Sequence, residues 1–263
     1  MRILILGGSG PAGRAIVSSL ATPENELVVY DLNPEKVVFP IDFHRGSVFF
    51  LDVRDTVGFD NLFFSAASVF SEFDALVYNI AATTELLTSQ DISPEEMKFE
   101  KAVDFNPEIW NLMFDINVNP VFRIISKMYS YIDEKQDLGN SIRLNKIIVT
   151  SSIYGRAIPD FNLYHGSQYV SFPGYGASKA ALEYLVRWAA SFFGPFGLRI
   201  NAISLGGVFN KHDDRFEQIY GTRVCLSRMA RATDIQGIYP FLLSSHADFI
   251  TGQVIRVDGG YLP

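Results

Sequence analysis

Cysteine and histidine are scarce in this chain. Cys225 is the only cysteine among 263 residues, which excludes an internal disulfide bond and a metal site built from cysteines. The four histidines, His44, His165, His212 and His246, are scattered and lack the spacing of metal ligands. We therefore expect no metal centre.

The chain also lacks long apolar runs and an excess of positive charge. No apolar stretch approaches the roughly 18 residues that suggest a membrane span, and the opening run Ile3–Leu6 is too short for the hydrophobic region of a signal peptide. The 29 acidic residues outnumber the 22 basic ones, for a formal charge of −7, whereas an extended nucleic-acid interface needs a basic face. We expect a cytoplasmic protein that binds small molecules and neither nucleic acid nor membranes.

Short apolar runs alternate with longer helical patterns along the whole chain. The short runs are continuous, as is typical of parallel strands buried on both faces. We expect strands at Arg2–Leu6, Glu26–Asp31, Ser47–Val53, Ala75–Ile80, Lys146–Ser152, Leu198–Ser204 and in the late segment VIRVD. We expect helices at Gly13–Ala21, Asn61–Glu72, Pro107–Ile132, Tyr175–Phe193 and Thr233–Leu243. This order predicts an α/β fold with a doubly wound, mostly parallel seven-stranded sheet, helices on both faces, and a single domain over residues 1–263.

The segment GGSGPAG follows the first expected strand and opens the first expected helix. Its glycines, Gly7, Gly10 and Gly13, permit a tight turn and a close approach of the backbone to a pyrophosphate group. The helix N-terminus behind the turn offers free N–H groups and a positive dipole end to that anion. A glycine-rich turn by itself can also be a plain strand-to-helix connection.

Residues at the ends of neighbouring strands favour dinucleotide binding. Asp31 ends the second strand, 18 residues after Gly13, where a carboxylate accepts hydrogen bonds from the adenosine ribose and repels a 2′-phosphate. No basic residue follows until Lys36, so we expect NAD rather than NADP. Asp52–Val53 and Asn79–Ala82 end the next two strands at the edge where an open α/β sheet binds its ligand, although Asp52 alone could be an ordinary loop cap.

Two tyrosine–lysine pairs share the spacing YxxxK. Tyr131 lies in the charged segment YIDEKQDLGN, which indicates a solvated helix end and no catalytic role. Tyr175 and Lys179 open a long helix after a strand ending in Ser151–Ser152, and the i,i+4 spacing places the lysine on the tyrosine's face. A free phenol has a pKa of about 10; a nearby ammonium and an oxidised nicotinamide favour the phenolate. Tyr175 is then a general base for alcohol oxidation or an acid for carbonyl reduction.

In the order GGSGPAG, Asp31, Asp52–Val53, NIAA, INVN, TSSIYG, YGASK and NAISLGG, the sequence resembles the short-chain dehydrogenase/reductase family over essentially its whole length. The late segments RMARATDI and ITGQVIRVDGG resemble the C-terminal part of that family. The resemblance implies a Rossmann fold and hydride transfer between a nicotinamide dinucleotide and a substrate carbon. It implies a catalytic tetrad of Asn117, Ser152, Tyr175 and Lys179. In that tetrad the serine orients the substrate oxygen, the lysine binds the nicotinamide ribose, and the asparagine helps to hold a water that connects the lysine to solvent.

The residues expected to bind the cofactor lie at the ends of the expected strands and in the turn. They are Gly7, Ser9, Gly10, Pro11, Ala12, Gly13, Asp31, Leu32, Asp52, Val53, Asn79, Ile80, Ala81, Tyr175, Lys179, Gly206 and Val208. Three positions depart from the family's commonest branch. Pro11 stands where that branch has glycine, Leu205 where it has proline, and Asn210 where a threonine often meets the nicotinamide carboxamide. None of these departures removes the tetrad.

Two intervals on the catalytic side are longer than is typical of the family, from Ser152 to Tyr175 and from Asn79 to Asn117. We expect them to shape the substrate pocket, although a neutral surface insertion would leave the same signature. The polar segment Phe209–Ser227 is expected to form a mobile lid.

Within the family, SSIYG, PDFNLY and GGVFN resemble the branch assigned to flagellin-glycan and nonulosonate sugar biosynthesis, whose members act on sugar derivatives that carry a phosphate or a nucleotide. Basic residues could meet such a phosphate near the pocket. The candidates are Arg156, His165, Lys211, His212 and Arg215.

The leading hypothesis is an NAD-dependent oxidoreductase acting on a hydroxyl or keto group of a sugar phosphate or nucleotide-sugar derivative. The enzymatic alternative is a 3-oxoacyl-carrier-protein reductase or a similar carbonyl reductase, which predicts NADPH and a basic surface; Asp31 and the acidic balance disfavour it. The other alternative is a non-catalytic dinucleotide-binding sensor, a class that usually lacks the tyrosine or the lysine. Relatives pair through the helices that follow Asn117 and Tyr175, so a homotetramer or homodimer is expected.

Overall fold

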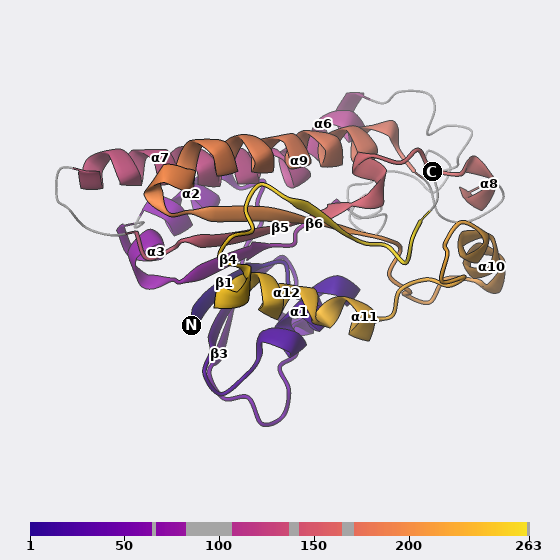
Figure 1. The fold of residues 1–263 in the computed structure, drawn as a ribbon, viewed down its shortest axis with the longest axis horizontal. Helices are drawn as coiled ribbons and strands as arrows, with labels where there is room; N and C mark the ends of the chain where they lie inside the picture. Colours follow the sequence, from indigo (N-terminus) through magenta and orange to yellow (C-terminus); the bar gives the residue numbers. More distant parts are fainter. Residues whose placement is uncertain (65–66, 83–106, 137–141, 165–170, 262–263) are drawn as a thin grey trace.

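The computed structural model of the chain describes residues 1–64, 67–82, 107–136, 142–164 and 171–261. Seven strands form one sheet in the order β3-β2-β1-β4-β5-β6-β7 (Figure 1). The strands are β1 (Arg2–Leu6), β2 (Glu26–Asp31), β3 (Gly46–Phe50), β4 (Ala75–Tyr78), β5 (Lys146–Ser152), β6 (Arg199–Leu205) and β7 (Val254–Val257). Every neighbouring pair is parallel, which confirms the predicted doubly wound sheet.

Helices cover both faces of this sheet. The main helices are α1 (Pro11–Leu20), α2 (Thr56–Phe64), α3 (Ala67–Glu72), α6 (Pro107–Asn117), α7 (Asn119–Gln136), α8 (Phe161–Tyr164), α9 (Pro173–Phe193), α10 (Asp214–Thr222), α11 (Ala232–Gln236) and α12 (Ile238–Leu243). In Figure 1, α7 and α9 lie along one face, whereas α1, α11 and α12 lie against the other. The prediction that residues 1–263 form a single domain stays a prediction.

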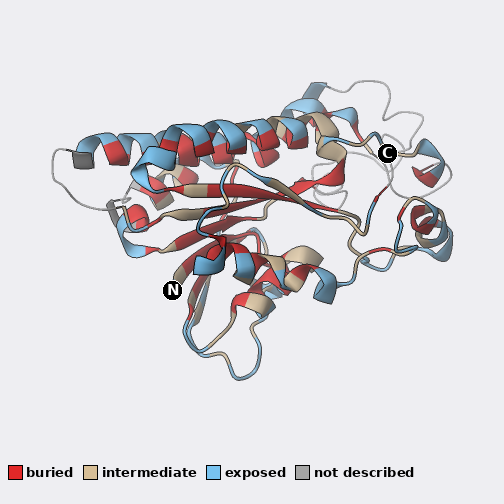
Figure 2. Ribbon diagram, in the orientation of Figure 1, coloured by how far each residue is buried: buried red, intermediate tan, exposed pale blue. Residues whose placement is uncertain are grey.

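The strand pleat divides the core into two apolar layers. Along β1, Leu4 and Leu6 belong to the layer under α7 and α9, whereas Ile3 and Ile5 belong to the layer under α1 and α12. All four side chains are fully buried, because successive residues of a strand point to opposite faces. Figure 2 shows the resulting buried central strands, with exposed residues on the outer faces of the helices.

The predicted strands match the structure at β1, β2 and β5 and differ by a few residues elsewhere. The third strand ends at Phe50 rather than Val53, because the Asp52 carboxylate accepts a hydrogen bond from the Arg54 N–H and turns the chain. The fourth ends at Tyr78, after which the Asn79 side chain bonds the glycine-rich turn.

The predicted helix Pro107–Ile132 is two helices, α6 and α7, separated at Val118. Pro120 causes the break, since proline cannot donate to the carbonyl four residues earlier and its ring clashes with it. That carbonyl belongs to Ile116, and the buried hydroxyl of Tyr78 donates to it instead, at 2.5 Å. Asn117 therefore lies at the break.

The described residues of the expected helix Asn61–Glu72 are helical, in α2 and α3, and residues 65–66 between them lie outside the described residues. One further helix prediction is corrected in the same way. The expected helix Thr233–Leu243 is divided into α11 and α12, because Pro240 cannot donate to the carbonyl of Gln236.

Tyr131 is not on a solvated helix end, as its charged neighbours suggested. It is buried in the layer under α7, with its ring centroid 5.3 Å from that of Phe70. In α7 its neighbours Asp133 and Glu134 are exposed; the helix is amphipathic to its end, and the charged residues occupy only the outer face.

The insertion after Ser152 and the expected lid Phe209–Ser227 pack together as a third apolar cluster. Leu163 and Tyr164 of α8 meet Phe216 and Tyr220 of α10 in this cluster. The expected lid is therefore not uniformly polar, because its helix is amphipathic.

Within the described ranges, no helix is long and apolar enough to cross a membrane. The same ranges contain no group of three or more His, Cys, Asp or Glu side chains that could hold a metal ion.

Candidate active site at the carboxyl edge of the sheet

The glycine-rich turn is compressed on one side and open on the other. Gly7 has a φ of +96°, and a Cβ there would lie 2.9 Å from the main-chain carbon of Asn79. A Cβ on Gly13 would lie 2.6 Å from the carbonyl oxygen of Gly7. Gly10 differs, because nothing lies within 4 Å of a Cβ built on it. The turn thus needs glycine at two positions for its own packing and leaves open space at the third.

Helix α1 begins directly at this open position. Gly10 is the N-cap, no side chain caps the first turn, and no acidic residue lies in it. Pro11 occupies the first helical position, where the missing N–H costs nothing and the fixed φ suits the helix. The remaining N–H groups and the positive dipole end are available to an anion. These residues fit the pyrophosphate of a dinucleotide, and the departure at Pro11 does not disturb that fit.

Asp31 supports the turn from beneath. Its Oδ2 accepts hydrogen bonds from the N–H groups of Gly8 at 2.7 Å and Ser9 at 2.8 Å. Its Oδ1 accepts from the Ser9 hydroxyl and the Asn33 N–H, each at 2.8 Å. The buried carboxylate thus stabilises the turn through these hydrogen bonds, a role that sequence reasoning missed. Its contact with the adenosine ribose stays a prediction.

The other predicted cofactor residues lie around the same strand ends. Asp52 is held by Arg54, whose guanidinium lies 2.6 Å away and lowers the pKa of the Asp52 carboxyl. The Asn79 amide donates to the Gly7 carbonyl at 2.9 Å, so it ties the end of β4 to the turn. Leu32, Val53, Ile80, Ala81, Gly206 and Val208 follow the ends of β2, β3, β4 and β6.

Lys179 is a buried ammonium group beside Tyr175. It is 1% exposed, and its Nζ lies 5.7 Å from the centroid of the Tyr175 ring. The Nζ donates to the main-chain carbonyl of Thr150 at 3.2 Å. Burial lowers the pKa of Lys179 to about 8, and the carboxyl of Glu183 opposes that fall.

Ser152 completes the group. A hydrogen bond with Ser152 lowers the pKa of the Tyr175 phenol, but burial raises it by more, and the net direction is upward. The fall in phenol pKa that the sequence suggests depends on a bound oxidised nicotinamide as well as on the ammonium of Lys179, and it stays a prediction. The structure does bring together the serine, tyrosine and lysine that the sequence singled out.

The Asn117 side chain joins three elements. It is 0% exposed; its Oδ1 accepts from the Ala82 N–H at 2.9 Å and its Nδ2 donates to the Ser178 hydroxyl at 2.8 Å. Ser178 in turn donates to the Tyr175 carbonyl at 2.7 Å. The amide thus locks the end of α6 to the loop after β4 and to the first turns of α9.

Sequence reasoning missed the partner of Ser151. The Ser151 hydroxyl donates to Oε1 of Glu183 at 3.0 Å, and Glu183 is 2% exposed. A signal was present, because Tyr175, Lys179 and Glu183 follow one another at intervals of four residues and so share a helix face.

The candidate phosphate-binding residues that the structure describes have different surroundings. Arg156 is exposed, and its positive charge opposes the rise in the pKa of the Glu183 carboxyl that burial causes. Lys211 is exposed and precedes α10. His212 stacks on Phe216 at 4.8 Å, and burial lowers the pKa of its imidazole. Arg215 donates to the carbonyl of Asn162 at 3.1 Å. His165 and most of the enlarged interval from Asn79 to Asn117 lie outside the described residues.

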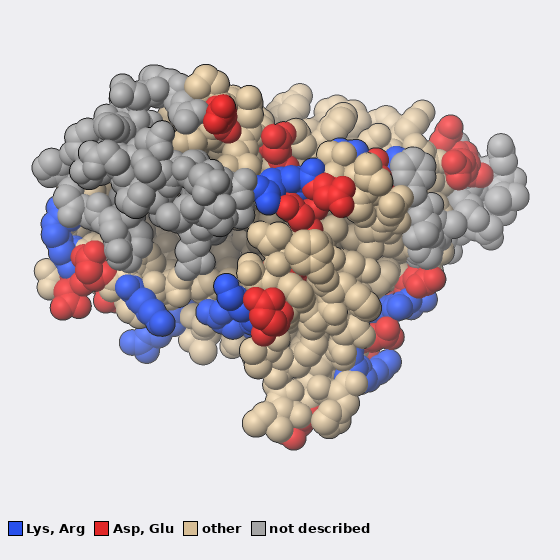
Figure 3. Space-filling view, turned by 180° about the vertical axis from the view of Figure 1, so that it is seen from behind, with Lys and Arg blue, Asp and Glu red and all other residues tan. Residues whose placement is uncertain are grey.

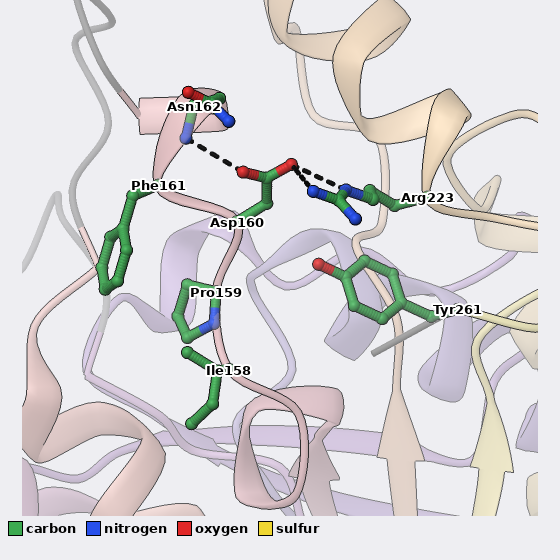
Figure 4. A pocket seen from close by; sticks show the side chains of 7 residues that line it. All are labelled: Ile158, Pro159, Asp160, Phe161, Asn162, Arg223 and Tyr261. Atoms are coloured by element: carbon green, nitrogen blue, oxygen red, sulfur yellow. Dashed lines mark hydrogen bonds and ion pairs between the residues drawn. The ribbon is translucent and has the colours of Figure 1, made fainter.

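A cavity of about 330 Å³ lies between the insertion and the end of α10. Its lining residues are Ile158, Pro159, Asp160, Phe161, Asn162, Arg223 and Tyr261. Figure 4 shows Asp160 and Arg223 facing each other there, with the guanidinium Nη2 2.6 Å from Oδ2. Tyr154, which connects this region to the site, bonds the Tyr164 hydroxyl at 2.7 Å and meets the Tyr175 ring edge-on.

Charges on the face shown in Figure 3 are mixed rather than gathered by sign. Basic and acidic side chains lie beside one another in small groups among uncharged residues.

Comparison with known proteins identifies the class to which this site belongs. A family model described as "Enoyl-(Acyl carrier protein) reductase" matches residues 10–262. L-2,3-butanediol dehydrogenase of Corynebacterium glutamicum is 27% identical over 283 residues, which cover 98% of this chain and 97% of that one. A short chain dehydrogenase from Leptospira borgpetersenii with bound NAD+ is similar in structure, with a TM-score of 0.77 and 27% identity, covering 98% of this chain and 91% of that one.

The chain therefore belongs to the short-chain dehydrogenase/reductase family. It is an NAD(P)-dependent oxidoreductase that acts on CH–OH groups. The narrower resemblance to flagellin-modifying proteins has partial support. Post-translational flagellin modification protein A of Campylobacter coli is 33% identical over 141 residues, which cover 53% of this chain and 52% of that one.

Replacement of Lys179 by methionine should abolish turnover and stabilise the fold. A lysine whose pKa falls to about 8 in the folded state, from 10.5, disfavours folding wherever it must be protonated. The penalty is complete below about pH 8 and vanishes above about pH 10.5. We expect Lys179→Met to raise the free energy of unfolding by about 1–3 kcal/mol at pH 7 and by much less at pH 10, as measured by urea denaturation.

Lys146→Met, at the start of β5, is the matched control and should change the free energy of unfolding by less than about 0.5 kcal/mol. A Lys179→Met protein less stable than wild type at pH 7 would contradict the assignment of a costly buried ammonium.

Proposed function

We propose that this enzyme transfers a hydride between NAD(H) and a hydroxyl or keto group of a sugar phosphate or nucleotide-sugar derivative, with Tyr175 as the acid/base. The observation that carries the proposal is the convergence of Ser152, Tyr175 and Lys179 at the end of β5. The open glycine-rich turn lies at the same edge of the sheet.

Each residue of the site has a proposed task. The Ser152 hydroxyl orients the substrate oxygen, and Tyr175 Oη takes the proton in alcohol oxidation or gives it in carbonyl reduction. Lys179 holds the nicotinamide ribose and, as an ammonium, stabilises the phenolate. The bound dinucleotide supplies the hydride chemistry.

Asn117 serves the proton path through its main chain. Its side-chain amide is hydrogen-bonded to Ala82 and Ser178. The main-chain carbonyl of Asn117, at the break between α6 and α7, is therefore the group that we propose holds a water for Lys179. Pro120 creates that break.

The insertion supports a polar, hydroxyl-rich substrate. Its cavity offers a carboxylate, a guanidinium and apolar walls close to Tyr154, which meets the catalytic tyrosine. Partial similarity to a flagellin modification protein points the same way. The second candidate is a 3-oxoacyl-carrier-protein reductase or a similar carbonyl reductase. The description of the family model names the same carrier with an enoyl group, so both substrate classes belong in one assay.

The acid/base role predicts that Tyr175→Phe abolishes turnover. Removal of the phenolic hydroxyl should lower kcat at least about 100-fold, because general acid–base catalysis contributes about that much or more. The measurement is absorbance of reduced nicotinamide with a panel of sugar phosphates, nucleotide sugars, 3-oxoacyl thioesters and 2,3-butanediol.

Tyr131→Phe, in the second YxxxK segment, is the matched control and should keep wild-type kcat. Full turnover by Tyr175→Phe would refute the proposal, a preference for acyl thioesters would favour the second candidate, and binding of dinucleotide without turnover of any substrate would favour a sensor.

The Asp31 carboxylate predicts a preference for NAD. The wild-type enzyme should bind NADH at least about tenfold more tightly than NADPH, because the 2′-phosphate would meet a buried negative charge. Asp31→Ser should weaken NADH binding about tenfold or more, since the N–H groups of Gly8 and Ser9 lose their acceptor. Fluorescence titration measures both, and Glu35→Ser, on a nearby exposed carboxylate, should change neither.

Tighter binding of NADPH than NADH by the wild-type enzyme would show that Asp31 does not select the cofactor. An Asp31→Ser enzyme with unchanged NADH affinity would show that its bonds to the turn are dispensable.

We also propose that the enzyme is a homo-oligomer that pairs through the outer faces of α7 and α9. Tyr184, Trp188 and Phe192 lie four residues apart on α9 and are 40–62% exposed. Trp188 stacks on Phe192 with centroids 5.1 Å apart, and Tyr129 of α7 lies 5.9 Å from Phe192. Such a stripe of exposed aromatic side chains is typical of an interaction surface.

Trp188→Asp should therefore lower the mass measured by light scattering from a multiple of 29.4 kDa towards that of one chain, because a charge would be buried in the interface. Phe249→Asp, at a fully exposed site after α12, is the control and should leave the mass unchanged. A wild-type monomer would refute this proposal.

A further inference from the structure

Glu183 is a buried carboxyl group that the proposed reaction does not use. It lies on the face of α9 that carries Tyr175 and Lys179, one turn beyond the lysine. It is 2% exposed, and a buried ionisable carboxyl needs partners to remain in the core of a protein. Its position beside the catalytic lysine raises the question of which group it serves.

Its surroundings contain donors and positive charges from every element packed against it. From β5, the Ser151 hydroxyl donates to Oε1 at 3.0 Å. From the 3₁₀ helix η2 (Ile153–Gly155) the backbone approaches so closely that a Cβ on Gly155 would lie 2.9 Å from Oε1. Arg156 follows η2, and Lys179 and Arg187 lie one turn before and one turn after it on α9.

We propose that Glu183 is a positioning residue that keeps Lys179 protonated in its buried site and fastens the serine-bearing end of β5 to α9. The inference rests on the proposed function of Lys179 as an ammonium. It extends that function to a fourth side chain behind the serine, the tyrosine and the lysine.

Glu183 and Lys179 favour each other's charged forms. Burial lowers the pKa of Lys179 to about 8, and the negative charge of Glu183 raises it. Burial also raises the pKa of Glu183, whereas Ser151, Arg187, Arg156 and Lys179 all favour its ionised form. The ionised carboxyl stabilises the ammonium, so loss of its charge lowers the pKa of Lys179 further, and the ammonium is lost at lower pH.

Ser151 and Ser152 are adjacent in β5 and have different partners. Ser151 bonds Glu183, whereas Ser152 bonds Tyr175. A second close contact joins α9 to η2, which directly follows β5, because a Cβ on Gly176 would lie 2.9 Å from the Tyr154 carbonyl oxygen. The bond from Ser151 to Glu183 thus helps to set the distance between the catalytic serine and the helix of the catalytic tyrosine.

Titration of Lys179 in the full-length protein tests the inference without a substrate. In protein labelled with [ε-¹³C]lysine, the Lys179 signal is assigned by its absence from Lys179→Met and followed by NMR against pH. Glu183→Gln keeps the size of the side chain and the acceptor for Ser151, and Glu183→Met removes both the charge and the acceptor. In both, the midpoint for Lys179 should fall by roughly 0.5–1.5 pH units, with Glu26→Gln, on the carboxylate that pairs with Arg2 at 2.9 Å, as the unshifted control.

The pH profile of kcat separates the two parts of the role. With the substrate that turns over fastest in the panel, the alkaline limb should move to lower pH in both variants. Glu183→Met should also lose roughly threefold to tenfold in kcat at the optimum, because Ser151 loses its acceptor.

If Glu183→Gln or Glu183→Met folds and its Lys179 midpoint stays at the wild-type value, the inference is overturned. A uniform loss of kcat over the pH range, without a shift of the alkaline limb, would also overturn it. The proposed function fails on a different result, namely full turnover by Tyr175→Phe.

Discussion

A buried ammonium group is the constraint on which the catalytic side of this structure depends. Lys179 is 1% exposed, so the free energy of removing its charge from water must be offset by nearby acceptors. The carbonyl of Thr150 and the carboxyl of Glu183 supply that compensation, from β5 and from the next turn of α9. The same two elements carry Ser152 and Tyr175, for which we propose the catalytic roles, so the bond from Lys179 to Thr150 also connects the strand and the helix that carry them.

A second constraint comes from Pro120 at the opposite side of the site. The proline breaks the helix that would otherwise run from α6 into α7, and the Tyr78 hydroxyl bonds the carbonyl of Ile116 that the proline releases. The break places Asn117 where its amide bonds Ala82 and Ser178. A backbone interruption, a buried phenol and an amide thus act together to connect the end of β4 with the helix of the catalytic tyrosine.

Much of the candidate site was predictable because its residues belong to short local patterns. The spacing of Tyr175 and Lys179 places them on one helix face, and GGSGPAG between a strand and a helix predicts a turn. Two sets of hydrogen bonds were not predictable: those that Asp31 accepts from Gly8 and Ser9, and the one that Ser151 donates to Glu183. They join residues more than twenty positions apart, and their geometry depends on how strands and helices pack.

By itself the sequence determined the parallel sheet, and it predicted the turn at the carboxyl edge and the side chains proposed to react, because apolar periodicity and helical spacing are local properties of the chain. Only the tertiary structure decided which charges are buried, which partners compensate them and which groups the basic residues near the insertion contact. Arg215 bonds Asn162 and Arg223 pairs with Asp160, both across the contact of the insertion with α10. Those pairings decide the electrostatics of the site, since the energy of a charge depends on its distance from others and on its exclusion from water.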